Sequence, residues 1–207
     1  MFRLRSITLL ILLLTALLSA DDKKKQRMLY FKPEQTADLE PAKVITAKQK
    51  CENWALAGGL ETLFKREGVA FDQNYWVTRL SGAEVCHQEL PSPEDFAHAV
   101  SQDVVLSDGR HVHLEATLVS GAPTDIDAII AGIKRQQLAL LLWHGHPYYL
   151  TGVTYDERIG ANGWRLFEVR ELRLADTFEK LPAATFQKGR DNADEINGVV
   201  TVTVTPQ

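Results

Sequence analysis

Residues 138–155, LALLLWHGHPYYLTGVTY, contain two apolar runs separated by a short turn, and they decide the fold. Leu138–Trp143 is continuously apolar, and Tyr148–Tyr155 is rich in the aromatic and β-branched residues that favour strands. Turn residues follow at 160–163, and they precede a third run from Trp164 to about Ala175. Together with a last strand at Val199–Val204, this order predicts an antiparallel sheet in the final third of the chain.

The segment before this sheet shows helical patterns. Apolar residues recur at spacings of three and four from Cys51 to about Arg66, which predicts a buried helix with Cys51 in its first turn. Ser92 followed by Pro93 predicts the start of a second helix, and residues 124–133 predict a third. Residues 104–114 alternate around a Ser-Asp-Gly turn and predict a hairpin. The predicted fold class is therefore α+β.

The N-terminus has the order of a secretory signal peptide. Arg3 and Arg5 precede an apolar run, Ile7–Leu18, that ends in small residues at Ser19-Ala20. The alternative is a membrane anchor, which would need roughly 20 apolar residues to cross a bilayer. We therefore expect cleavage after Ala20, no stable membrane insertion after it, and an exported protein that works in the periplasm or outside the cell.

The remaining chain is long enough for one domain with a sizeable core. We expect a flexible lead-in over residues 21–43, with a possible strand at Met28–Phe31, and a domain over residues 44–207. The formal net charge is −4, and no basic stripe is present of the kind that binding to phosphates requires. This composition argues against nucleic acid as a partner.

The two cysteines, Cys51 and Cys86, allow two interpretations. In an oxidising compartment, an even pair is typical of a structural disulfide. A cysteine at a helix N-terminus is also stabilised as a thiolate by the helix dipole, which a nucleophile needs. Both interpretations stay open at this point.

A thiol nucleophile needs a base and a group that orients the base. His144 and His146 lie at the junction between two predicted strands, and alternation would place both on one face of an extended segment. Counting outward from the centre of the turn at residues 160–163 places His146 opposite a position one residue from Asp176. The same register places the competing carboxylates Glu168 and Glu171 further away.

Three motifs in this order resemble the papain-like cysteine peptidases. They are Cys51-Glu52-Asn53-Trp54-Ala55 opening a helix, Gly145-His146-Pro147-Tyr148-Tyr149-Leu150-Thr151-Gly152-Val153 opening a strand, and Leu172-Arg173-Leu174-Ala175-Asp176 ending its partner. They are most similar to the bacterial branch that includes double-glycine leader peptidases and related secreted or effector proteases. The resemblance spans roughly residues 45–178.

The resemblance implies a fold in which a buried helix carries the cysteine and an antiparallel sheet carries the histidine and the aspartate. It implies Cys51 as nucleophile, His146 as general base and Asp176 as the orienting carboxylate. It further implies amide or acyl transfer through a thioester, a peptide or protein substrate and no cofactor. The family's oxyanion glutamine commonly lies five or six residues before the cysteine, whereas Gln49 lies two before it.

Two further functions are compatible with these residues. A papain-like domain that kept the fold, closed a Cys51–Cys86 disulfide and lost catalysis would act as a binding module. Alternatively, the pairs His111/His113 and His144/His146 have a spacing that can bind Zn or Cu, as in an exported metal carrier.

Overall fold

The computed structural model describes residues 28–40, 49–51, 53–86, 90–123, 125–177 and 184–207. The expected leader, residues 1–20, lies outside these ranges, as does the expected domain start near Val44. The chain divides into two compact units. The smaller one consists of Met1–Gln35 with Tyr155–Glu168, and the larger one of Thr36–Thr154 with Val169–Gln207.

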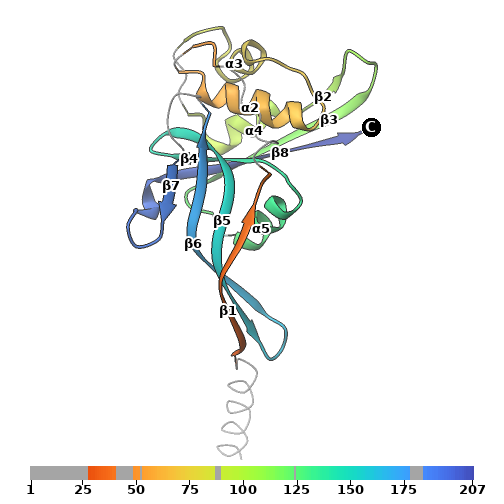
Figure 1. Cartoon of the computed structure of the whole chain (residues 1–207). Helices are drawn as coiled ribbons and strands as arrows, with labels where there is room; N and C mark the ends of the chain where they lie inside the picture. Colours follow the sequence, from red (N-terminus) through yellow and green to blue (C-terminus); the bar gives the residue numbers. More distant parts are fainter. Residues whose placement is uncertain (1–27, 41–48, 52, 87–89, 124, 178–183) are drawn as a thin grey trace, which may run out of the picture. The chain divides into compact units, whose positions relative to one another are not determined.

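The described residues form helices and an antiparallel sheet, so the α+β prediction is confirmed (Figure 1). The α-helices are α2 (Ala55–Arg66), α3 (Gln73–Ser81), α4 (Pro93–Val100) and α5 (Ile126–Lys134). The strands are β1 (Met28–Asp38), β2 (Gln102–Val105), β3 (His111–Ser120), β4 (Ala139–Trp143), β5 (His146–Gly160), β6 (Arg165–Asp176), β7 (Ala184–Gln187) and β8 (Ile196–Pro206). They are ordered β2-β3-β8-β4-β5-β6-β7, and β1 pairs with β5.

Helix α2 is mostly buried, as predicted. Leu60 and Phe64 have no exposed surface, and Gly59 lies against a leucine of β4. A Cβ at Gly59 would come within 2.6 Å of the Leu140 side chain, so this glycine allows the close packing of helix and strand. The buried Tyr149 hydroxyl of β5 donates to Thr62 Oγ1 at 2.8 Å, which adds a polar contact between the helix and the sheet.

The start of α4 has its predicted cap, and α5 begins within the segment predicted for it. The Ser92 hydroxyl accepts from the Asp95 backbone N–H at the start of α4, and the Asp125 carboxylate accepts from the Ala128 N–H at the start of α5. The expected hairpin at residues 104–114 is present as β2 and β3.

Helix α3 and strand β7 were not predicted. In α3, Asp72 caps the N-terminus and Gly82 ends the helix in the left-handed region. Its fully buried Trp76 stacks on Phe64 of α2, with ring centroids 4.6 Å apart. This contact packs α3 against the C-terminal turn of α2.

The expected flexible lead-in is partly a strand of the sheet, which corrects that prediction. Strand β1 runs to Asp38, well beyond the expected Met28–Phe31, and it pairs with β5. In the smaller unit, Lys32 of β1 forms an ion pair of 3.2 Å with the buried carboxylate of Glu157. Polar contacts therefore help to attach β1 to β5, although the composition of this segment suggested a solvated chain.

Candidate active site

His146 begins β5 directly after a two-residue turn. His144 and Gly145 form this turn with φ angles of 53° and 73°, which is the left-handed region that tight hairpins require. Trp143, the last residue of β4, pairs with His146 across the turn. Because His144 lies in the turn, it does not share a strand face with His146, and the expectation of two imidazoles on one extended face was wrong.

His146 contacts the carboxylate at the end of β6, as the hairpin register predicted. Its Nε2 lies 3.1 Å from Asp176 Oδ1. The Asp176 side chain is 1 % exposed, whereas the His146 side chain is 31 % exposed. Next to this pair, the Thr177 hydroxyl donates to the Pro147 carbonyl at 2.9 Å, which fixes the two strands at this level.

The competing carboxylates have other partners. Glu168 pairs with Arg158 at 3.2 Å, and Glu171 pairs with Arg173 at 3.1 Å. Among these three acidic residues of β6, Asp176 is therefore the one placed against His146.

This geometry sets the chemistry of the imidazole. With Asp176 ionised, Nε2–H donates to the carboxylate, and Nδ1 becomes the acceptor that faces away from it. Tyr148 contacts the His146 ring edge to face, with centroids 4.8 Å apart. Burial and the charge of Asp176 raise the pKa of the Tyr148 hydroxyl, so it stays a neutral hydrogen-bonding group.

Aromatic side chains extend the surface around His146. Trp143 lies 6.1 Å from Tyr148 between ring centroids, and 5.8 Å from Phe186 of β7. The Trp143 ring also stacks on His144 at 5.1 Å. This region combines flat apolar faces with a partly exposed imidazole.

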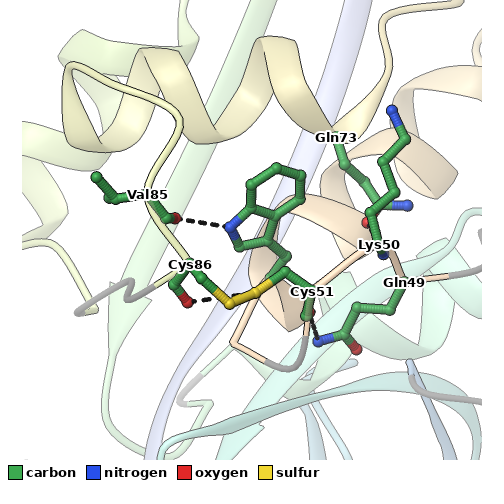
Figure 2. Close-up of a disulfide and its surroundings, with 7 residues drawn as sticks. Gln49, Lys50, Cys51, Gln73, Val85 and Cys86 are labelled. Atoms are coloured by element: carbon green, nitrogen blue, oxygen red, sulfur yellow. Dashed lines mark hydrogen bonds between the residues drawn. A yellow bond between two sulfur atoms is a disulfide. The ribbon is translucent and has the colours of Figure 1, made fainter.

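Cys51 is bonded to Cys86 in a disulfide with a Cα–Cα distance of 5.9 Å (Figure 2). It lies in a bend before α2, whose N-cap is Trp54, and not in the first helical turn. The expectation that the dipole of this helix activates the Cys51 thiol therefore does not apply to the observed helix start. Both cysteines of the chain are used in this bond.

A second contact reinforces the disulfide. The buried Trp54 indole N–H donates to the Val85 carbonyl at 2.7 Å, one residue before Cys86. Figure 2 shows Val85 next to Cys86 on the segment that is bonded to Cys51. The chain after α3 is thus fixed to the start of α2 by one covalent bond and one hydrogen bond.

Glutamines hold the segment that precedes Cys51. The Gln49 amide Nε2 donates to the Cys51 carbonyl at 2.7 Å, and the Lys50 N–H donates to Gln73 Oε1 at 3.0 Å. The buried Gln73 side chain also donates to Glu61 at 2.9 Å. Gln49 thus contacts the backbone next to the cysteine, while its oxyanion role stays a prediction.

The structure brings His146 and Asp176 together and bonds Cys51 to Cys86. Their catalytic roles stay predictions. Sequence reasoning gave no site role to Trp54 or Gln73, and the proximity of Trp54 to Cys51 in the sequence was the signal for the first of them. Thr177 lies near the position that the hairpin register placed opposite His146, but its hydrogen bond to Pro147 was not predicted.

The metal hypothesis gains no support from the described ranges, which contain no group of three or more His, Cys, Asp or Glu side chains placed to bind a metal ion. His113 instead contacts Asp103 at 2.6 Å, and His144 pairs with Glu195 at 3.4 Å. No helix in the described part of the chain is long and apolar enough to cross a membrane.

Comparisons of this chain with the models of protein families, with curated proteins and with solved structures found no match.

Proposed function

We propose that this chain is an exported, papain-like domain that binds a peptide or protein segment and does not hydrolyse it while the Cys51–Cys86 disulfide is closed. The observation that carries the proposal is the disulfide itself. A cysteine nucleophile acts as a thiolate, and neither sulfur of this chain is a thiolate when the bond is present. An oxidising compartment outside the cytoplasm favours such a bond.

The surface around His146 supplies the binding chemistry. Trp143 and Tyr148 offer aromatic faces, which bind apolar side chains and lose little conformational entropy on binding. The imidazole of His146, oriented by Asp176, offers a hydrogen-bonding atom to a peptide group. An extended polypeptide offers both apolar side chains and peptide groups. We therefore propose an extended polypeptide as the ligand.

A second candidate function is a cysteine peptidase that acts only when the disulfide is reduced, and the contact of His146 with Asp176 favours it. The Cys51 thiolate would attack a peptide carbonyl, and the His146 imidazolium would give its proton to the departing amine. Water, deprotonated by His146, would then hydrolyse the thioester and regenerate the thiol.

One set of variants separates the two functions. In the Cys86→Ser variant the Cys51 thiol is free, whereas the Cys51→Ser variant is the matched control with only the Cys86 thiol. We expect the oxidised wild type to be two hydrogens lighter than the reduced form, to resist iodoacetamide and to leave fluorogenic peptides intact. We expect the Cys86→Ser variant to leave them intact as well.

Hydrolysis by the Cys86→Ser variant that disappears in the Cys51→Ser control and in a Cys86→Ser, His146→Ala double variant would establish the reduction-dependent peptidase. Hydrolysis by the oxidised wild type would overturn the proposed binding function. The binding function also requires that the oxidised wild type retain peptides from a random library. Trp143→Ala and Tyr148→Ala should each reduce this retention, whereas Val105→Ala, at an exposed position on β2, should not.

A further inference from the structure

Two hairpin turns of the chain have the same hydrogen-bonded backbone. In the turn between β5 and β6, the Gly160 N–H donates to the Trp164 carbonyl at 2.9 Å, and the Gly163 N–H donates to the Gly160 carbonyl at 3.0 Å. In the turn between β2 and β3, at residues 106–110, the two equivalent bonds measure 2.8 and 2.9 Å. Gly163 and Gly109 have φ angles of 80° and 86°, the left-handed conformation that a three-residue turn of this kind requires. The two turns are therefore a matched pair.

The residue before the glycine is an amide in one turn and a carboxylate in the other. Asn162 Oδ1 accepts from the Trp164 N–H at 3.4 Å, and Asp108 Oδ1 accepts from the Arg110 N–H at 3.1 Å. Both Asn162 and Asp108 are exposed. Hydrogen bonds from the Arg110 backbone and side chain hold the pKa of the Asp108 carboxyl below its ordinary value, so this group is ionised at neutral pH. An ionised carboxylate is a poor electrophile, whereas the uncharged Asn162 amide is open to attack by a nucleophile.

The nucleophile next to the Asn162 amide is the backbone nitrogen of Gly163. Glycine has no Cβ to shield this nitrogen, and the turn is exposed, so fluctuations of the turn bring it against the side-chain carbonyl carbon. The bond between this nitrogen and that carbon forms, the bond from the carbon to NH2 breaks, and the Gly163 proton leaves with the ammonia. Water then opens the resulting succinimide ring at either carbonyl, which gives aspartate or isoaspartate.

The same dipeptide, Asn-Gly, also occurs at positions 197–198, where the sheet holds it. Asn197 Oδ1 accepts from the Gly145 N–H at 2.6 Å, and the Asn197 carbonyl accepts from the Gly121 N–H at 2.8 Å. Gly198 is buried between β3 and β4, where a Cβ would come within 2.7 Å of a backbone oxygen of β3. Ring closure at Asn197 has to break these contacts, so it requires that this part of the sheet opens.

We propose that the exposed turn makes Asn162 a site of spontaneous deamidation in the folded chain, whereas Asn197 and Asp108 are protected. Either product places a new carboxylate in the turn. The isoaspartate product also lengthens the backbone of the turn, whose length sets the register of β5 and β6. Modified molecules should therefore have a less stable hairpin. This inference stands independently of the proposed function.

The test uses the full oxidised chain, incubated at mildly alkaline pH with and without concentrated guanidinium chloride. Peptide mapping by mass spectrometry, with chromatographic separation of aspartate from isoaspartate, measures the modified fraction at each position. In the folded chain we expect Asn162 to react at least about ten-fold faster than Asn197. In denaturant the two Asn-Gly sequences should react at rates within about three-fold of each other, because the sheet no longer protects Asn197.

Two variants locate the cause in the turn. Asn162→Gln should abolish the reaction at this position, because the longer side chain has to close a six-membered ring, which is slow. Asp108→Asn places an amide in the matched turn, and this position should then react within about five-fold of the rate of Asn162. Equal unfolding midpoints of the variants and the wild type would show that these rates belong to folded chains.

Three outcomes would each overturn the proposal. They are an unmodified Asn162 in the folded chain, equal rates at Asn162 and Asn197 without denaturant, and an unreactive amide in the Asp108→Asn variant.

Discussion

The region around Cys51 and the region around His146 were both predicted to supply catalytic groups, and the fold holds them in opposite ways. Cys51 is fixed by a covalent bond to Cys86, and a hydrogen bond from Trp54 to Val85 joins the same two segments. His146 is oriented by a noncovalent contact with Asp176 and remains partly open to solvent. Thus the His146 imidazole remains accessible for chemistry, whereas the Cys51 thiol is consumed in a structural disulfide.

Removing the disulfide should produce the largest effect on stability. The bond closes a loop with a sequence separation of 35 residues, so its loss in the Cys51→Ser, Cys86→Ser variant should lower the free energy of unfolding by about 3–4 kcal/mol. Urea unfolding monitored by tryptophan fluorescence measures this change. Reduction of the wild type should shift the midpoint by a similar amount, and an unshifted midpoint would refute a structural role for the bond.

Breaking the His146–Asp176 contact should have a smaller effect. Asp176→Asn keeps the size of the buried side chain and removes its charge, which should cost about 1–2 kcal/mol of unfolding free energy. The double-mutant cycle with His146→Gln should give a coupling energy of at least about 0.5 kcal/mol, because the two side chains are in direct contact. Additive effects of the two substitutions would contradict a contact in solution.

The polar support of the cysteine region should have the smallest effect, and it should depend on pH. The Asp72 carboxylate accepts from Lys50, next to Cys51, and from the Tyr75 N–H; the Lys50 hydrogen bond is the larger cause of its lowered pKa. A lowered pKa in the folded state stabilises it above the ordinary aspartate pKa, and this stabilisation is lost as the pH falls through the folded value.

Asp72→Asn keeps a good helix cap and removes only the charge. It should lower stability by less than about 1 kcal/mol at pH 7, because both side chains are about half exposed. The difference between variant and wild type should shrink in urea unfolding experiments as the pH falls below the ordinary aspartate pKa and through the lower folded value. A difference that does not change with pH would mean that the cap and not the charge is responsible.

The parts of the site that were predictable are local in the sequence. Asp176 could be assigned to His146 because β5 and β6 form one hairpin, whose register follows from its turn at residues 160–163. The buried α2 was predictable because its apolar residues keep a helical spacing over about three turns.

The state of Cys51 was not predictable, because it depends on a helix with a weak pattern. The apolar residues of α3 are Tyr75, Trp76, Val77 and Leu80, and only Trp76 and Val77 of these are buried. The helical period of this short segment is therefore indistinct. Because α3 was not predicted, the sequence could not show that the chain after this helix brings Cys86 back to Cys51. Strand β1 was underestimated for a related reason: its second half, Pro33–Asp38, is rich in residues that disfavour strands, and pairing with β5 overrides this preference.

The close approach of α2 to β4 implies that positions 59 and 140 must vary together. Since a Cβ at Gly59 meets the Leu140 side chain and not backbone, a smaller residue at position 140 would leave room for alanine at position 59. In a library with both positions randomised, folded clones should contain either glycine with a large partner or alanine with a small one. An alanine at position 59 of the helix would thus be retained only together with a smaller residue at position 140 of the strand.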